Sequence, residues 1–157
     1  MVLFLKNLAF TIVAPGTAAF LIPWLIVGGK RTDLGFMTLV STLFFVLGSA
    51  IYLWCIWDFA TVGRGTPAPI DAPKKLVTRG LYQYSRNPMY IGVLILILAW
   101  ATSFKAIILL VYMLIVGLAF HTFVILYEEP HLRKLFGESY FNYCARVPRW
   151  LPRIRGG

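Results

Sequence analysis

Two adjacent carboxylates, Glu128 and Glu129, follow an uncharged run from Ala106 to Tyr127 and precede Pro130. Carboxylates at the edge of an apolar segment repel each other and are costly to remove from water, so they require a cationic partner. An acid at the C-terminal end of a helix also opposes the helix dipole, which argues against a simple solvated helix end. The pair is therefore predicted to belong to a site that binds a cation or accepts a proton.

A second polar segment ends in Arg86-Asn87-Pro88. Proline suits the first position of a helix, and the residue before it avoids the α conformation, so Asn87 is predicted as an N-cap and Pro88 as the start of a helix. A helix start presents free N–H groups and the positive end of the dipole. With Arg86 beside it, this start can bind a carboxylate or phosphate. The alternative is a capped helix with Arg86 on a lipid headgroup.

One small zwitterion, with a carboxylate and with positive amino and sulfonium groups, would satisfy both polar segments. His121 lies seven residues before Glu128, two helical turns earlier on the same face. It either lines the same site or is a histidine satisfied by helix packing, and both readings stay open. No metal-binding cluster, nucleophilic triad or Walker loop is visible, and Gly63-x-Gly65 is too short to indicate a phosphate loop.

The elements that must position these residues are apolar helices. Hydrophobic residues make up 59% of the 157-residue chain and charged residues 13%, whereas a soluble domain has about 25% charged residues. This composition excludes a water-soluble enzyme, a disordered tail and a disulfide-stapled module. A bilayer core of ~30 Å needs about 20 apolar residues per helix. The runs of suitable length are 8–27, 34–57, 88–104 and 106–127.

The predicted fold is therefore all-α: a single polytopic membrane domain, residues 1–157, with about four transmembrane helices. Residues 1–57 supply the first two helices and residues 58–157 the binding part. The first run contains Pro15-Gly16 and Pro23, so a kinked or broken helix is expected there. A cleaved signal peptide is the alternative, disfavoured because the run exceeds the usual h-region of roughly 7–15 residues.

The distribution of positive charge predicts the orientation. The net charge is +9, and such a surplus in so apolar a chain favours anchoring on anionic lipid over nucleic-acid binding. Three cations, Lys30, Arg31 and Lys105, fall on one side of a four-helix arrangement. The other side holds twelve: Lys6, Arg64, Lys74, Lys75, Arg79, Arg86, Arg133, Lys134, Arg146, Arg149, Arg153 and Arg155. Both termini and the site are therefore expected to be cytoplasmic.

The chain becomes amphipathic from Pro130 onward. Apolar side chains recur at steps of three and four: Leu132, Leu135, Phe136, Tyr140, Tyr143, Cys144 and Val147. This pattern predicts a helix lying on the inner membrane surface with its apolar face buried, ended by Pro148 and followed by Trp150 as an interfacial anchor. Cys55 and Cys144 are expected to be free thiols, because neither sits in a disulfide framework.

Several motifs together resemble the isoprenylcysteine carboxyl methyltransferase and phospholipid methyltransferase superfamily, over about residues 63–152. They are Gly80-Leu81-Tyr82-x-Tyr84-x-Arg86-Asn87-Pro88-Met89-Tyr90, Glu128-Glu129-Pro130-x-Leu132 and Phe136-Gly137-x-x-Tyr140-x-x-Tyr143-x-x-x-Val147-Pro148-Arg149. The resemblance implies an all-helical membrane enzyme that uses S-adenosylmethionine, bound on the cytosolic side. Carried over, it implies cofactor-binding roles for Tyr82, Arg86, Asn87, Pro88, Tyr90, Glu128 and Glu129, with His121 added, and catalytic roles for Arg86, Glu128 and Glu129.

The sequence departs from the isoprenylcysteine enzymes at two points. Asn87 stands where the eukaryotic members have histidine, and residues 123–126 hold no arginine before the acidic pair. The expected function is methyl transfer to a lipophilic acceptor at the membrane–cytosol interface. The acceptor stays open between an isoprenoid-type acid, a phospholipid amine and a thiol. A small membrane assembly or accessory protein is the non-enzymatic alternative.

Overall fold

The computed structural model describes residues 12–28, 35–63 and 75–151. Features predicted at Lys6, Lys30, Arg31, residues 64–74, Arg153 and Arg155 lie outside the described residues. The helical elements are η1 (Ile12–Leu21), α2 (Ile22–Val27), α3 (Phe36–Asp58), η2 (Phe59–Gly63), η4 (Gly80–Gln83), α4 (Pro88–Phe104), α5 (Ile107–Phe123), η5 (Val124–Glu128), α6 (Glu129–Phe136) and α7 (Glu138–Arg146). The prediction of an all-α fold is confirmed for this part of the chain.

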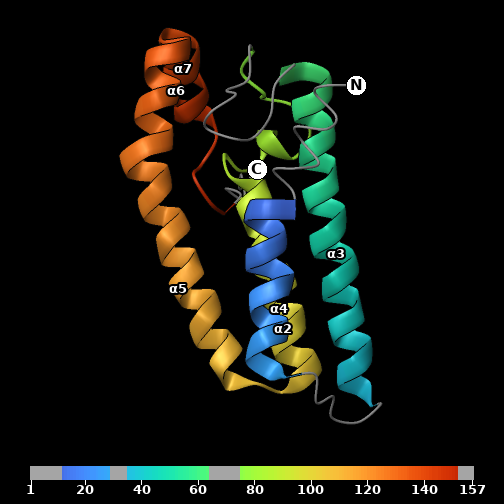
Figure 1. Cartoon of the computed structure of the whole chain (residues 1–157). Helices are drawn as coiled ribbons and strands as arrows, with labels where there is room; N and C mark the ends of the chain where they lie inside the picture. Colours follow the sequence, from blue (N-terminus) through green and yellow to red (C-terminus); the bar gives the residue numbers. More distant parts are fainter. Residues whose placement is uncertain (1–11, 29–34, 64–74, 152–157) are drawn as a thin grey trace.

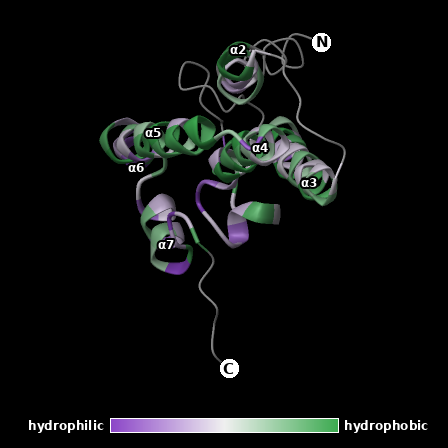
Figure 2. Cartoon of the chain, turned by 90° about the horizontal axis from the view of Figure 1, so that it is seen from below, coloured by the Kyte–Doolittle hydropathy of each residue, from purple (hydrophilic) through white to green (hydrophobic). Residues whose placement is uncertain are grey.

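The long helices run side by side in one layer (Figure 1). Seen along their axes, α4 lies between α3 and α5, with α2 against one face of this row and with η4 and α7 on the other (Figure 2). The segment 75–87 and the helices α6 and α7 lie at the same end of the bundle (Figure 1). This arrangement brings the two polar segments predicted to share a site to one place.

Among the described residues, two helices are long and apolar enough to cross a membrane, namely 36–63 with 28 residues and 107–136 with 30 residues. Only 22% and 17% of their most apolar windows are buried within the molecule, so these are not core helices of a water-soluble fold. Pro88–Phe104 and Pro15–Val27 are shorter apolar helices. Of the four spans predicted, two therefore meet the length of a full crossing, and the other two are not shown to cross.

The helix that carries Glu128 and Glu129 does not end there. α5, η5 and α6 follow one another without a break to Phe136, so the prediction that Pro130 opens a separate surface helix is wrong. The reason is the π-helical turn Val124–Glu128. A π turn shifts the backbone hydrogen bonds by one residue, and Pro130, which has no N–H to donate, is accommodated directly after it. The acidic pair is therefore interior to a continuous helix.

The N-terminal helix is irregular, as its prolines predict. Residues Ile12–Leu21 are π-helical and contain Pro15, and the regular α-helix starts only at Ile22, with Pro23 in its first turn. Proline has no backbone N–H to donate. Pro15, like Pro130, therefore lies where the helix departs from the α pattern of hydrogen bonds.

Close packing of α3 on α4 depends on two small residues. A Cβ added at Gly48 would lie 2.9 Å from the Gly92 carbonyl oxygen, and one at Gly92 would lie 3.1 Å from the Gly48 carbonyl oxygen. Glycine at both positions lets the two backbones approach, as at many helix contacts in membranes. The core around this contact includes the buried side chains of Val93, Leu96 and Ile97.

The amphipathic C-terminal segment packs on the protein itself. α6 continues the line of α5, and α7 folds back beside it (Figure 1). The apolar face predicted for the membrane surface supplies a small core of Tyr140, Tyr143 and Val147, against which Leu132 and Phe136 pack. The predicted amphipathic pattern is present, but its apolar face is largely covered by neighbouring segments, because the turn at Gly137 (φ +51°) reverses the chain.

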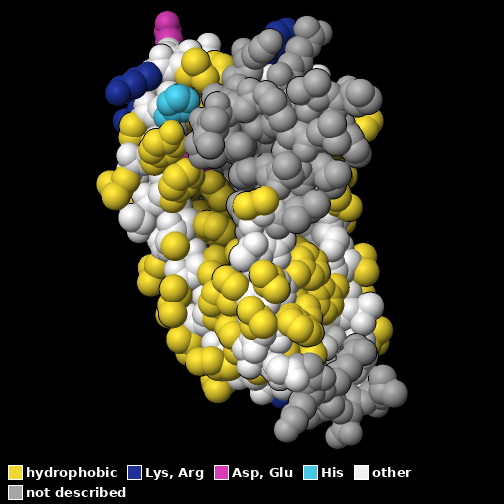
Figure 3. All heavy atoms as spheres, viewed as in Figure 1, with side chains coloured by type: hydrophobic (Ala, Val, Ile, Leu, Met, Phe, Trp, Pro, Cys, Tyr) yellow, Lys and Arg dark blue, Asp and Glu magenta, His cyan; other side chains and the backbone are white. Residues whose placement is uncertain are grey.

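Charged side chains are concentrated at one end of the molecule. On the face seen in Figure 3, hydrophobic side chains cover most of the length, and the coloured charged groups gather mainly where α6 and α7 lie. The end that holds the predicted site is thus the polar end of an otherwise apolar bundle, as expected at a membrane surface.

Candidate active site

The centre of the polar end is the buried carboxylate of Glu129. Its side chain is 6% exposed. Arg86 donates from Nη1 to Oε1 at 2.9 Å. Arg149 donates from Nε to Oε1 at 2.7 Å and from Nη2 to Oε2 at 3.0 Å. A buried charge is tolerated only when it is paired and hydrogen-bonded, and here two arginines meet that condition.

The second carboxylate has a different partner. Tyr90, in the first turn of α4, donates its hydroxyl to Glu128 Oε2 at 2.9 Å. In the part of the chain that the structure describes, no hydrogen bond reaches Glu128 Oε1. The adjacent acids therefore differ in character: Glu129 is held by cations, whereas Glu128 keeps one oxygen available.

Pro88 places Arg86 at the start of α4. Pro88 occupies the first turn of that helix, as predicted, and Asn87 precedes it with an extended φ of −130°. The N-cap prediction for Asn87 holds for its position but not for its side chain, which makes no cap hydrogen bond. Its Nδ2 instead donates to the Arg149 carbonyl at 3.0 Å, and Arg86 N donates to the Pro148 carbonyl at 2.9 Å. These bonds join the two segments that supply the arginines.

Tyr82 packs the segment before Arg86 against its neighbours. Its buried ring lies edge-on to Phe59, with 5.6 Å between ring centroids, and its carbonyl accepts the Tyr143 hydroxyl at 2.7 Å. Burial raises the pKa of Tyr143, so this hydroxyl stays protonated and can donate. Tyr82 therefore holds the segment before Arg86 between η2 and α7.

Aromatic rings surround the acidic pair on the α5 side. The Trp150 indole donates from Nε1 to His121 Nδ1 at 3.0 Å. The ring of Tyr90 lies 4.5 Å from Phe120 and 6.4 Å from Trp150, measured between centroids. Because an indole N–H can only donate, His121 Nδ1 is the acceptor, and a neutral imidazole then carries its proton on Nε2. His121 is thus joined to the C-terminal segment through Trp150, which was predicted only as a membrane anchor.

A second ion pair fixes the start of the same segment. Arg79 Nε donates to Asp58 Oδ1 at 3.0 Å, and its Nη2 donates to Thr61 Oγ1 at 2.7 Å. The next residue, Gly80, has φ +59°, and an added Cβ there would overlap Asp58 Oδ2. Glycine is required at this close approach. The sequence analysis assigned no role to Asp58. The residues around it do not indicate that the end of α3 contacts Arg79, 21 positions later.

Arg149 is the main site residue without a predicted role. It belongs to the Val147-Pro148-Arg149 motif and was counted among the cations, yet no pairing was assigned to it. The hydrogen bond to Glu129 raises the pKa of Arg149 above its usual value, so the guanidinium stays charged. The sequence did contain a signal for this role: two adjacent carboxylates need more than the one positive charge that Arg86 supplies.

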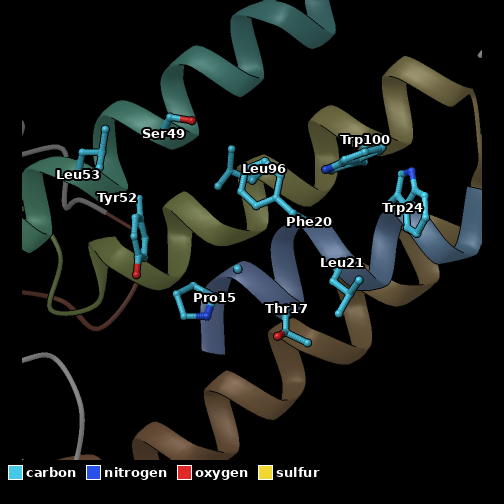
Figure 4. A pocket seen from close by; sticks show the side chains of 11 residues that line it. Pro15, Thr17, Phe20, Leu21, Trp24, Ser49, Tyr52, Leu53, Leu96 and Trp100 are labelled. Atoms are coloured by element: carbon cyan, nitrogen blue, oxygen red, sulfur yellow. The ribbon is translucent and has the colours of Figure 1, made fainter. Parts of the chain in front are cut away.

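An apolar cavity of about 810 Å³ lies between the N-terminal helix and the α3–α4 pair. Side chains from η1 and α2 face those of α3 and α4 across it (Figure 4). The cavity is lined by Pro15, Gly16, Thr17, Phe20, Leu21, Trp24, Ser49, Tyr52, Leu53, Leu96 and Trp100. Its lining is suited to a hydrocarbon group rather than to a polar ligand.

Fold and site together define a helical membrane protein with an ionic cluster at one end of its bundle. Residues 36–139 match the family described as phospholipid methyltransferase, and the chain belongs to that family. The chain is 37% identical over 84 residues to protein-S-isoprenylcysteine O-methyltransferase B of Arabidopsis thaliana, covering 51% of this chain and 41% of that protein. It is 33% identical over 82 residues to methanethiol S-methyltransferase of Crocosphaera subtropica, covering 52% and 31%.

A relative from rice is similar over most of the chain. The probable protein-S-isoprenylcysteine O-methyltransferase of Oryza sativa is 28% identical over 155 residues, which is 94% of this chain and 74% of that protein. The chain thus spans less than half of the first two relatives and about three quarters of the third. The superfamily resemblance drawn from the motifs is confirmed, and the relatives differ in the atom named as methylated.

Proposed function

We propose that this chain transfers a methyl group from S-adenosylmethionine to a lipophilic acceptor at the polar end of the bundle. The observation that carries the proposal is the shared hold of Arg86 and Arg149 on the buried Glu129, beside Glu128. The cluster joins the start of α4, the middle of a long helix and the C-terminal segment. Cations and anions alternate over a few ångströms, which suits a ligand that carries both signs.

The residues present fit the charged groups of this cofactor. Arg86 Nε is buried and has no hydrogen-bond partner among the described residues, so it can donate to a carboxylate. Glu128 Oε1 can accept from an amino group. The rings of Tyr90, Phe120 and Trp150 offer π faces, which attract a positive sulfonium. We assign cofactor-binding roles to Arg86, Tyr90, Glu128 and Glu129, with Asn87, Pro88, Tyr82 and His121 positioning them.

The cofactor, when bound, supplies an activated methyl group, so the protein's task is to bind and orient. When a protein holds the methyl donor and the acceptor in line, the reaction proceeds as if one reactant were present at a very high concentration. Such effective molarities reach ~10⁵–10⁸ M in well-oriented systems. A thiolate or carboxylate acceptor needs no base, whereas an ammonium must first lose a proton. Both oxygens of Glu129 are occupied by arginine, and His121 Nδ1 is occupied by Trp150. Glu128 is then the group we assign to accept that proton.

The acceptor is proposed to be lipophilic because an apolar cavity of about 810 Å³ opens between the N-terminal helix, α3 and α4. A hydrocarbon tail there gains roughly 25 cal/mol for each Å² of apolar surface that it buries. Named relatives act on an isoprenylcysteine and on methanethiol. We propose an acid or thiol with a hydrocarbon tail, with a phospholipid amine as the alternative that would use Glu128.

We further propose that the polar end, and with it both termini, faces the cytosol. Of the described Lys and Arg side chains, all but Lys105 belong to segments at the site end, and Lys105 follows the opposite end of α4. Positive side chains accumulate on the cytosolic side of membrane proteins.

One experiment separates the enzyme from the non-enzymatic alternative. The protein, reconstituted in lipid nanodiscs, is incubated with methyl-labelled S-adenosylmethionine and with a prenylated cysteine, phosphatidylethanolamine or a long-chain thiol. We expect saturable cofactor binding by calorimetry and label in one of the three acceptors. If the cofactor does not bind and no membrane lipid gains label, the proposal is wrong and an assembly or accessory role is favoured.

A further inference from the structure

A second cavity lies at the polar end, outside the Glu129 cluster. It has a volume of about 750 Å³ and is lined by Ala50, Trp54, Trp57, Asp58, Arg79, Gly80 and Gln83. Four of these residues come from the last turns of α3, and three come from η4 and the residue before it. The described partners of the Glu129 carboxylate, Arg86, Arg149 and Arg133, do not line this cavity, so the proposed methyl-transfer site does not account for it.

The positive group of the cavity is held ready to bind an anion. Arg79 is fixed by its hydrogen bonds to Asp58 and Thr61, and 52% of its side chain remains exposed, against 4% for Asp58. The remaining N–H groups of the guanidinium can therefore reach a ligand in the cavity. A fixed guanidinium fork matches the oxygens of a phosphate, which is why arginine is common at phosphate sites.

An apolar strip leads from this cavity along α3. Its members recur at steps of four and three and are exposed: Leu43, Leu47, Ala50, Trp54 and Trp57. From Leu47 to Trp57 the helix rises ~15 Å, which is half of a ~30 Å bilayer core and so the depth of one leaflet. Tryptophans at the polar end of such a strip are placed as in the interfacial belt of membrane proteins.

We infer that the cavity and the strip together form a site for one phospholipid, distinct from the acceptor site. The phosphate is held by Arg79 at the depth of Trp54 and Trp57, and an acyl chain lies along the strip toward Leu47. The phosphate is the charged group that a bilayer presents at this depth, and among the described residues that line the cavity Arg79 is the cation. Because the same Arg79 also binds Asp58, the lipid steadies the segment that leads to Arg86. The inference does not depend on methyl transfer.

Photolabelling of the wild-type protein tests the site. The protein is placed in nanodiscs with a phosphatidylglycerol that carries a diazirine on its acyl chain, and crosslinked peptides are mapped by mass spectrometry. Labelling of residues 47–57 is expected to exceed that of Ile115, Leu118 and Leu126, an equally exposed face of α5 and η5 in the same leaflet. A diacylglycerol with the same acyl chain lacks the phosphate. With this probe, the ratio of labelling between residues 47–57 and the α5 face should fall about fivefold, equivalent to ~1 kcal/mol.

Two variants with the same change of charge test whether lipid labelling depends on the charge in the cavity. Gln83→Glu adds a negative charge to the cavity without changing Asp58 or Arg79, and it should reduce labelling of the strip about fivefold. Asn142→Asp makes the same charge change at an exposed position on α7 and should leave labelling unchanged. Equal labelling of the two helix faces, or no effect of Gln83→Glu, overturns the inference in favour of ordinary boundary lipid. Displacement of the label by inorganic phosphate would show a free-phosphate site instead.

Discussion

Arg149 binds both oxygens of Glu129, with Nε 2.7 Å from Oε1 and Nη2 3.0 Å from Oε2, although the two residues are 20 positions apart. This two-point contact fixes the plane of the carboxylate. Arg86 approaches the same Oε1 at 2.9 Å from the start of another helix. Glu129 therefore connects the C-terminal segment to the start of α4, and the proposed cofactor site depends on this connection.

Glu129→Gln should weaken binding of S-adenosylmethionine by at least about tenfold. Hydrogen bonds to charged groups contribute ~1.5–3 kcal/mol, and two arginines lose their anion in this variant. Calorimetric titration in nanodiscs measures the change. Glu138→Gln, which removes an exposed acid at the start of α7, is the control and should bind the cofactor normally. Unchanged affinity in both variants would contradict the site.

Arg149→Lys should reduce cofactor affinity roughly tenfold. Lysine keeps the charge but cannot make the two parallel hydrogen bonds that orient the carboxylate. The matched variant is Arg146→Lys, at an exposed position whose guanidinium donates to the Asn142 carbonyl and is not paired with Glu129. If Arg149→Lys and Arg146→Lys bind the cofactor equally well, the two-point contact has no role in binding.

Glu128→Gln should separate the classes of acceptor. A general base contributes typically ~10²–10⁴-fold, so methylation of an amine should fall by that factor, whereas methylation of a carboxylate, which is already ionised at neutral pH, should hardly change. The measurement is kcat with each acceptor at saturating cofactor. The control is Glu138→Gln, which removes an exposed acid at the start of α7 and should leave kcat with both acceptors unchanged. An equal loss with amine and carboxylate in Glu128→Gln would exclude the base role.

Gly80→Ala should destabilise the protein more than Gly28→Ala. Both residues have φ near +60°, and an L-residue in the left-handed region costs roughly 1–2 kcal/mol. At Gly28 an added Cβ meets nothing within 4 Å, whereas at Gly80 it overlaps Asp58 Oδ2 and lies 2.9 Å from Trp54 Nε1. The overlap adds about 1–3 kcal/mol, so Gly80→Ala should unfold at least ~2 °C below Gly28→Ala. Equal melting temperatures would show that the contact with Asp58 is loose.

The sequence predicted features that depend on local chemistry. Apolar runs predicted the positions of the helices, since a run of this length must be buried or embedded in lipid. Pro88 predicted the start of α4, because its fixed φ and missing N–H are tolerated there. The spacing of Arg86 and the acidic pair predicted a shared site, and the motifs predicted the family.

The predictions that failed concern the ends of elements and the partners of side chains. Pro130 was expected to start a new helix, but a π turn before it lets the long helix continue, and that turn leaves no mark in the residue pattern. The Asn87 side chain was expected to cap its own helix, but the carbonyl of Arg149 competes for it. An N-cap hydrogen bond is local, whereas this one requires the C-terminal segment to be in place.

What the amino-acid sequence alone determined is the class of molecule: an apolar, helical, membrane-bound chain with charges of both signs in two short segments. Hydrophobic length and proline geometry act within a few residues, so they can be read directly. Only the tertiary structure decided that Arg149 completes the Glu129 cluster, that Trp150 meets His121, and that Asp58 holds Arg79. Each of these contacts joins residues about 20 to 30 positions apart, and their geometry depends on how the helices pack rather than on the local sequence.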